Sequence, residues 1–414
     1  MTTMAIDNKD KKVLKSSIER EQNEVACSAE CEKIKGSKNL NVPPLRFPEF
    51  TEEWKAEQLD NIATLSKGIG ISKEQLSEDG EPCILYGELY TKYKSEIIKQ
   101  VESKTDINGS KHKRSKANDV IIPCSGETAV DIATARCVPF DNILFGGDLN
   151  VISLHQYDGA FMSYQLNGKR KYDIARVAQG VSIVHLYGEH LKAIKTYNPT
   201  LPEQQKIAKL LSLLDDRIDT QNKIIEDLKK LKSAISERLF KSVKGFTVLL
   251  SDLCDIVKGK QINGENLSDS GNYYVMNGGT EPSGYYDNYN VEASTISISE
   301  GGNSCGYVQF NTSPFWSGGH CYSIQNIADK VDNMYLYHYL KSNEDAIMKL
   351  RIGSGLPNIQ KKDLAMFKII VPKIEWQIKI STFLSSLERK AEIEERIQNV
   401  MQKQKLYLLQ QMFI

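Results

Sequence analysis

The chain has 414 residues, 40% of them apolar, and its 53 basic side chains are balanced by 53 acidic ones. This length is too great for one compact core and predicts two to four domains. The balanced charge excludes the overall basic excess that marks a simple nucleic-acid binder.

The N-terminal segment, residues 1–41, precedes the first recognisable pattern, and we interpret it as an extension that is either disordered or helical. Its charged start lacks the apolar stretch of a secretory signal, and no run of eighteen apolar residues follows anywhere. The eight cysteines lack paired spacings, which is typical of reduced thiols. We therefore expect a cytoplasmic protein with no membrane partner.

A first globular domain is expected over residues 42–200, and its early part recurs without a gap 191 residues further along the chain. The ten matching pairs are Leu59 and Leu250, Ile62 and Leu253, Leu65 and Ile256, Lys67 and Lys258, Gly68 and Gly259, Ile71 and Ile262, Leu76 and Leu267, Gly80 and Gly271, Ile84 and Val275, and Gly87 and Gly278. Each copy reads as a short amphipathic segment, a strand that ends in Lys-Gly, a turn and a second strand. A second globular domain is accordingly expected over residues 246–372.

A long helix is predicted after each domain, over residues 201–243 and 373–414. In the first helix, the 3-4 spacing places apolar residues at seven of nine seam positions, which predicts one partner helix. These seven are Leu211, Leu214, Ile218, Ile225, Leu228, Ile235 and Leu239, and the two polar ones are Gln221 and Lys232. The second seam is looser, with Leu384, Leu387, Ala391, Met401, Leu408 and Met412 interrupted by Glu394, Gln398 and Lys405.

The predicted fold class is therefore mixed α/β, with two similar globular domains separated by two long helices that pack antiparallel as a coiled coil. Each helix spans roughly 38 residues, or about 57 Å. Two similar domains at that distance favour two related sites that are read together, such as the halves of a site on duplex DNA, whose helical turn is about 34 Å. The alternative is an old duplication in a coiled-coil scaffold that binds proteins.

Three stretches resemble the specificity subunit of type I restriction-modification systems from about residue 42 to the end. They are the segment Pro44–Phe50 followed by Trp54, the Lys-Gly turns at 67 and 258, and Leu-Pro-Glu-Gln-Gln-Lys-Ile at 201–207, which opens a long helix. The tail Arg351–Ile359 is also similar to the end of such a recognition domain. The second helix departs from the pattern, because Trp376-Gln377 stands where the first has Glu203-Gln204.

The resemblance implies that each domain, as a target recognition domain, reads one half of a bipartite, asymmetric DNA target, while the helices set the gap. It also implies partners: two adenine methyltransferase subunits and two motor-nuclease subunits, which would use S-adenosylmethionine, ATP and Mg²⁺. Glu203, Gln204 and the seam residues are the expected partner and coiled-coil contacts. The chain itself is expected to need no cofactor.

Candidate DNA contacts are loop residues that donate hydrogen bonds to phosphates or base edges. In the first domain they are Lys67, Gly68, Lys111, His112, Lys113, Arg114, Lys169 and Arg170; in the second they are Lys258, Lys260, Asn277, Gly278, Asn303, His320 and Arg351. A solvated surface loop is the alternative for each basic cluster. Acidic residues outnumber basic ones in both domains, so we expect weak DNA binding by the isolated chain.

No catalytic or metal site is predicted. The chain lacks an Asn-Pro-Pro-aromatic loop, a glycine-rich nucleotide turn, a Gly-x-x-x-x-Gly-Lys-Ser/Thr motif and paired Cys-x-x-Cys spacing. Glu53-Trp54-Lys55 has only part of a nuclease pattern. We therefore expect sequence recognition without catalysis.

Overall fold

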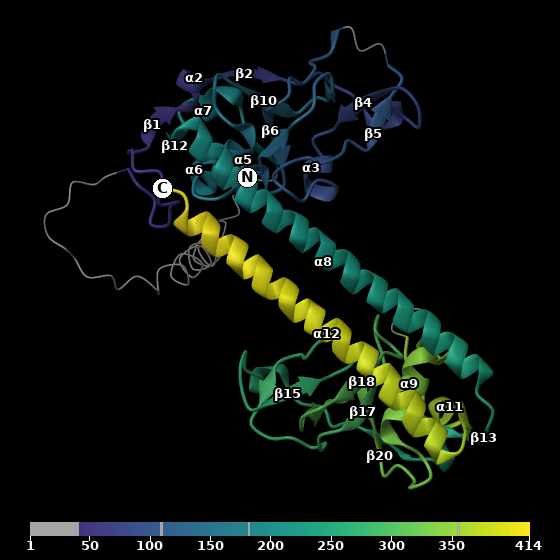
Figure 1. The fold of residues 1–414 in the computed structure, drawn as a ribbon. Helices are drawn as coiled ribbons and strands as arrows, with labels where there is room; N and C mark the ends of the chain where they lie inside the picture. The colour runs from purple at the N-terminus through teal and green to yellow at the C-terminus, as the bar shows by residue number, and fades with distance from the viewer. Residues whose placement is uncertain (1–40, 108–110, 181–182, 354, 356) are drawn as a thin grey trace, which may run out of the picture. The chain divides into compact units, whose positions relative to one another are not determined.

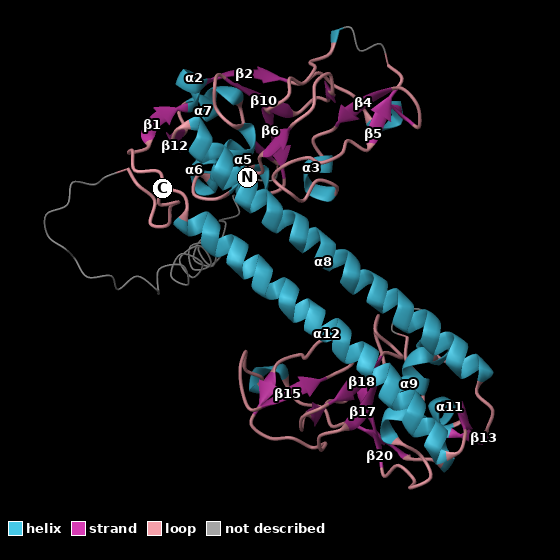
Figure 2. Cartoon of the chain, viewed as in Figure 1, coloured by secondary structure: helices cyan, strands magenta, loops and turns pink. Residues whose placement is uncertain are grey.

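A computed structural model describes residues 41–107, 111–180, 183–353, 355 and 357–414, so residues 1–40 of the predicted N-terminal extension lie outside the described residues. The chain divides into two compact units, one of residues up to 208 together with 408–414, and one of residues 209–407. Strands and helices occur in both units (Figures 1 and 2), so the mixed α/β class is confirmed.

The first unit is built on a four-stranded antiparallel sheet with the order β2 (Ala63–Lys67), β10 (Leu149–Leu154), β6 (Asp119–Pro123), β8 (Arg136–Val138). The run Val-Ile-Ile in β6 is buried throughout, as expected for a central strand covered on both faces. Helices complete the core: α2 (Leu59–Ile62), α4 (Ala129–Ile132), α5 (Gly159–Asn167), α6 (Lys171–Val177) and α7 (Gly188–Lys192).

Shorter strands extend this domain. A second sheet has the order β3 (Leu76–Ser77), β5 (Ser103–Thr105), β4 (Glu81–Ile84), β9 (Leu144–Phe145), beside η1 (Lys73–Gln75) and α3 (Glu88–Thr91). Two strand pairs add β1 (Lys55–Gln58) with β12 (Lys195–Asn198), and β7 (Ser125–Gly126) with β11 (Val184–His185).

The globular part of the second unit repeats this topology. Its antiparallel sheet has the order β14 (Asp255–Lys258), β20 (Cys321–Gln325), β17 (Thr295–Ser299), β18 (Val308–Asn311). When the four strands of each sheet are numbered by their order in the chain, their order across the sheet is first, fourth, second, third in both domains. The internal repeat is therefore confirmed. The remaining elements are β13 (Phe246–Leu249) with β21 (Lys368–Val371), β15 (Tyr273–Met276) with β16 (Tyr285–Tyr286) and β19 (Trp316–Ser317), η3 (Leu250–Asp252), η4 (Gly264–Asn266), α9 (Asn333–Ser342), α10 (Glu344–Met348) and α11 (Lys361–Ala365).

The repeat contains one gap that the sequence comparison missed. Equivalent hydrogen bonds run from Gly146 N to Ile84 O, at 2.9 Å, and from Gly318 N to Met276 O, at 2.8 Å. Ile84 therefore corresponds to Met276 rather than to Val275. The physical reason is the turn before β4 and β15, which is one residue longer in the second domain. Gly80 has a φ of +109° there, a left-handed conformation that Gly271 does not adopt.

The first residues of each long helix are fixed by a glutamine at the same position. In α8 (Leu201–Ser242), Gln204 accepts from Asp158 N at 2.9 Å and donates to Pro199 O at 2.8 Å. In α12 (Ile374–Gln411), Gln377 accepts from Asp332 N at 2.8 Å and donates to Pro372 O at 2.9 Å. Because Asp158 and Asp332 cap α5 and α9, each glutamine joins a long helix to its domain.

The far end of each long helix docks through a phenylalanine. In the first unit, the Phe413 ring lies 5.2 Å from the Phe161 ring of α5 and 6.3 Å from the Trp54 ring. In the second unit, Phe240 at the end of α8 lies 5.7 Å from Tyr335 of α9. Each globular domain is thus held by the start of one helix and the end of the other.

The two helices pack antiparallel within the second unit, as predicted. Lys405 Nζ lies 2.7 Å from Asp215 Oδ1, and Lys232 Nζ lies 2.5 Å from Glu388 Oε1. All nine seam positions of α8 are buried or half-buried, as are Leu384, Leu387, Ala391 and Met401 of α12. The polar interruptions contact the other helix, since Gln221 Nε2 donates to Glu394 Oε2 at 2.6 Å. Such buried polar contacts favour one register of the pair.

Candidate nucleic-acid interface

The predicted contact Lys67 lies at one end of the central sheet in the first domain. Its Nζ is 3.6 Å from Asp148 Oδ1, and the side chain is 60% exposed. Backbone hydrogen bonds from Gly68 N to Leu149 O, and from Cys124 N to Asp148 O, bring the ends of β2, β10 and β6 together. We call this end of the sheet the strand-end edge of the first domain.

The Lys-Gly recurrence has a packing reason. A Cβ added at Gly68 would stand 2.0 Å from Gly146 O, and one at Gly259 would stand 2.2 Å from Gly318 O. Only glycine fits between two backbones this close. Gly68, a predicted DNA contact, is therefore required by the fold itself.

The basic segment 111–114 lies beside the same edge. His112 Nε2 is 3.4 Å from Gly70 O, and Phe145 N donates to Lys113 O at 2.9 Å. Lys111 is exposed. Arg114 is engaged internally, because its guanidinium binds both Glu81 oxygens at 2.5 and 3.0 Å. This contact lowers the pKa of the Glu81 carboxyl.

The remaining pair predicted in this domain lies elsewhere. Arg170 donates to Ile414 O at 2.8 Å, pairs with Asp173 at 3.1 Å, and stands over the Tyr197 ring at 5.4 Å. It is only 18% exposed. Arg170 thus contacts the C-terminal residues, and the structure does not bring it to the strand-end edge. The neighbouring Lys169 is exposed.

The second domain has an equivalent strand-end edge, centred on Glu300. Lys258 Nζ lies 2.6 Å from Glu300 Oε1, and His320 Nδ1 lies 3.7 Å from Glu300 Oε2. The Tyr322 hydroxyl donates to Glu300 Oε1 at 3.2 Å, and burial raises the pKa of Tyr322. Glu300 is only 9% exposed, whereas Lys258 and His320 are 52% and 63% exposed. A buried carboxylate therefore holds two exposed cationic or donor groups at this edge.

Other predicted residues gather around His320. Asn277 Oδ1 accepts from His320 N at 3.2 Å. Gly278 has a φ of +89°, and a Cβ there would lie 3.0 Å from the His320 Cβ. Lys260 N donates to Ser317 O at 2.8 Å. Asn303 and Arg351 are exposed on neighbouring loops. Asn277 and Gly278, predicted from a separate part of the sequence, thus lie against His320 at this strand-end edge.

Sequence reasoning missed the acids that hold these lysines, because Asp148 and Glu300 come from different strands in the two domains. The candidate DNA contacts chosen from the sequence also did not include His185 or Asn358. These two positions differ by 173, the offset that relates the two long helices.

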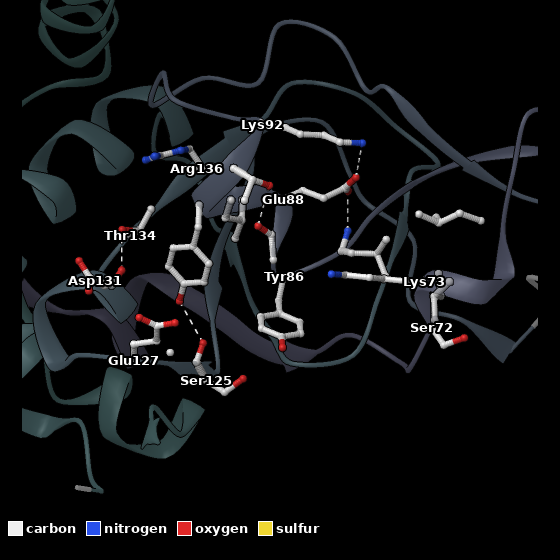
Figure 3. Close-up of a pocket in the computed structure, with 18 of the residues that line it drawn as sticks. Ser72, Lys73, Tyr86, Glu88, Lys92, Ser125, Glu127, Asp131, Thr134 and Arg136 are labelled. Carbon is white, nitrogen blue, oxygen red and sulfur yellow. Dashed lines mark hydrogen bonds and ion pairs between the residues drawn. The ribbon is translucent and has the colours of Figure 1, made fainter. Parts of the chain in front are cut away.

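A hollow of about 1490 Å³ opens in the first domain, and Ser125 and Glu127, which follow β6 in the chain, line part of it (Figure 3). Its lining includes Tyr86, Tyr90, Glu127 and Ser125, and Tyr90 donates to Ser125 O at 3.0 Å. The figure shows Glu88 reaching toward Lys92, whose Nζ lies 2.8 Å from Glu88 Oε1. The tyrosine rings and mixed charges offer stacking and hydrogen bonding rather than one catalytic group.

Within the described residues, no group of three or more His, Cys, Asp or Glu side chains is placed to hold a metal ion. In the same part of the chain, every helix is too short or too polar for a membrane span.

Comparison with known proteins identifies the family. The model of the type I restriction modification DNA specificity domain matches residues 51–230 and 245–403. The MjaVIII specificity subunit of Methanocaldococcus jannaschii is 24% identical over 87% of this chain and 91% of its own length. Putative type I specificity subunits of Mycoplasma genitalium and Mycoplasma pneumoniae are 34% and 32% identical, over 29% and 34% of this chain. The matches span 31% and 38% of those two proteins.

Solved structures show the same fold. The S subunit of a type I restriction-modification system from M. genitalium gives a TM-score of 0.64 at 20% identity, covering 90% of this chain and 99% of its own. A chain from a study of type I assembly and conformational transition gives 0.55 at 16% identity, covering 88% and 98%. Since the family model covers well over half of the sequence, in both halves of the repeat, the chain belongs to the type I restriction-modification DNA specificity family.

Proposed function

We propose that this chain is the sequence-reading subunit of a type I restriction-modification enzyme. Each domain reads one half of a bipartite, asymmetric DNA target with the side chains of its strand-end edge. The observation that carries the proposal is that the fold builds this edge twice, with an exposed lysine at the same place but different polar neighbours. Two copies of the same backbone arrangement that carry different side chains are suited to reading two different half-sites.

Phosphate contacts are the weak part of this interface. Lys67 and Lys258 are both paired with acids, and both domains carry more acidic than basic residues. Because phosphate neutralisation supplies most nonspecific affinity, the isolated chain is expected to bind DNA weakly. Partner subunits supply the missing contacts in this proposal. Nanomolar, sequence-specific binding by the chain alone, seen as an electrophoretic shift, would contradict it.

The helices offer a surface for those partners. Outside the seam, α8 exposes Leu213 and Leu231 at 52% and 50%, and α12 exposes Ile393 and Val400 at 49% and 64%. Exposed apolar side chains outside the seam of a helix pair are candidate contacts for a partner protein. We assign this surface to two adenine methyltransferase subunits, with two motor-nuclease subunits completing the enzyme. S-adenosylmethionine, ATP and Mg²⁺ act in those partners, and this chain carries out no catalytic step.

Co-expression with the cognate methyltransferase subunit tests the proposal. Sequencing of methylated bases is expected to reveal one motif with two defined halves, a fixed unread gap, and a methylated adenine in each half. A protein-binding scaffold, the alternative function, produces no such motif. Methylation that needs the methyltransferase but occurs without this chain would also contradict the proposed function.

A further inference from the structure

Residues 185 and 358 occupy the same place in the two domains. Gln179 and His185 exchange backbone hydrogen bonds at 2.8 and 2.6 Å, and Ile352 and Asn358 exchange theirs at 2.8 and 3.0 Å. His185 also pairs with Ser125, as Asn358 pairs with Gly301. Each residue therefore pairs on two sides, with an earlier residue of its own segment and with the strand-end edge of its domain.

The residue that follows each of them anchors the position. Leu186 N donates to Cys124 O at 2.8 Å, and Ile359 N donates to Glu300 O at 2.8 Å. Leu186 and Ile359 are both fully buried. Because side chains alternate along an extended segment, His185 and Asn358 face away from the core, and both are exposed.

The same anchors connect these positions to the strand-end lysines. In the first domain, Cys124 N donates to Asp148 O at 2.7 Å, and Asp148 pairs with Lys67. In the second domain, Glu300 both accepts from Ile359 N and binds Lys258. Each exposed side chain is thus fixed by a short series of contacts to the lysine of its own edge.

The two side chains are chemically different and available. The His185 ring stacks near the Tyr187 ring, with centroids 6.2 Å apart. Within the described residues, neither the imidazole of His185 nor the amide of Asn358 is hydrogen-bonded to a protein group. An asparagine amide matches the N6 and N7 edge of adenine with two hydrogen bonds, whereas a histidine ring offers single contacts in another geometry.

We propose that His185 and Asn358 are specificity-determining residues, each selecting one base pair of its own half-site, with Asn358 selecting adenine. This inference rests on the proposed function. It goes further because it assigns one base-reading position to each domain and makes the difference between the half-sites partly a difference between these two side chains.

The test exchanges the side chains in the full chain, co-expressed with its methyltransferase partner. His185→Asn is expected to change the preferred base at one position of one half-site, and Asn358→His at one position of the other. Asn358→Ala is expected to weaken discrimination at that position by roughly 5- to 150-fold, the value of one bidentate base contact. The readout is the methylated motif.

Matched controls lie at the opposite ends of the same sheets. His155 is exposed beyond β10 and contacts Thr64, and Gln325 ends β20. His155→Asn and Gln325→His are expected to leave the motif unchanged. Equal motif changes in these controls would overturn the inference, because the effect would then not depend on the strand-end edge.

A wild-type chain that directs no bipartite methylation contradicts the function itself. A normal wild-type motif that both exchanges leave unaltered overturns only the role of His185 and Asn358. If an exchanged complex is folded but inactive, competition binding with duplexes varied at each position decides, and an unchanged base preference again overturns the proposal.

Discussion

At the residue scale, a buried carboxylate begins the first long helix. Glu203 has no exposed surface, and its two oxygens accept from Arg46 at 2.6 and 2.7 Å, while Trp54 Nε1 donates to Oε1 at 3.3 Å. The Glu203 contact also raises the pKa of Arg46. Glu203, expected from the sequence to meet a partner subunit, is instead enclosed by its own domain. The corresponding Trp376 of α12 is 58% exposed, so this ion pair has no copy there.

Removing this carboxylate should destabilise the first domain. Glu203→Ala leaves the largely buried Arg46 cation without its partner, and such losses cost about 3–5 kcal/mol. Urea unfolding followed by tryptophan fluorescence measures the change, since Trp54 lies at the site. Glu226→Ala, which breaks an exposed ion pair with Lys230 on the same helix, is the control and should change little. Equal midpoints for both variants would contradict the role of Glu203.

A buried histidine should make the second domain sensitive to acid. Burial lowers the pKa of His338 from 6.5 to about 4, and its Nε2 lies 2.9 Å from Ser385 Oγ of α12. The folded state therefore favours the neutral ring, so stability is fully present above pH 6.5 and is lost as the pH falls toward 4. The loss approaches about 3 kcal/mol. In His338→Gln, the free energy of unfolding should depend less steeply on pH over that range. Parallel profiles for the two proteins would refute this assignment.

Residue roles of this kind were beyond sequence reasoning. The partners of Glu203 lie 157 and 149 positions away, and no local pattern links them. The same holds for the strand-end lysines, because one acid precedes β10 and the other follows β17. By contrast, Lys258, Asn277 and His320 were selected from loop chemistry alone, and the fold brings them together.

At the element scale, the two start-of-helix glutamines should act alike. Gln204→Ala and Gln377→Ala each remove hydrogen bonds from buried backbone groups, and each should destabilise its domain by about 1–3 kcal/mol. Hydrogen exchange should speed up at the Asp158 and Asp332 amides, respectively. Gln205→Ala is the matched control, because Gln205 is exposed one position further along α8. Unchanged exchange at Asp158 in Gln204→Ala would show that the glutamine does not hold α5 to α8.

Long helices were predictable because the 3-4 spacing of apolar residues is local information. The polar residues that interrupt the seam could also be recognised in the sequence, but their contacts could not be predicted. Glu394 contacts Gln221, and Lys405 contacts Asp215, because the helices are antiparallel. Elements of two to five residues, such as β7 and β11, carry no periodic signal. Their pairing depends on contacts between distant segments, so the pairing of His185 with Ser125 could not be predicted from the sequence.

At the scale of the whole molecule, the duplication was the strongest prediction from sequence, since glycines forced by close backbone approach recur at fixed offsets. Its limit is equally physical. Because the turn before β15 is one residue longer, the residues that follow it correspond one position later than the comparison without a gap assumed. Matching residues before and after this turn concealed the shift. In both copies of the repeat, a phenylalanine near the end of a long helix packs into a domain core. Phe413 lies beside Trp54 in the core of the first unit, and Phe240 lies beside Tyr335 in the core of the second unit.

The length of the paired helices should determine the unread gap of the target. Removing one heptad from each helix, residues 218–224 of α8 and 394–400 of α12, keeps the seam in phase and deletes both partners of the Gln221–Glu394 contact. Each helix shortens by about 10 Å, equivalent to about three base pairs of duplex. The methylated motif should keep both half-sites and lose about three base pairs from its gap.

Deleting the heptad from α8 alone is the informative comparison, because the Lys232–Glu388 and Asp215–Lys405 contacts then cannot form together. Methylation should fall sharply in that variant, whereas the paired deletion should remain active with a shorter gap. Both outcomes follow from the helices acting as a matched pair of fixed length. A paired deletion that methylates the original motif with its original gap would mean that the partner subunits, and not these helices, set the spacing.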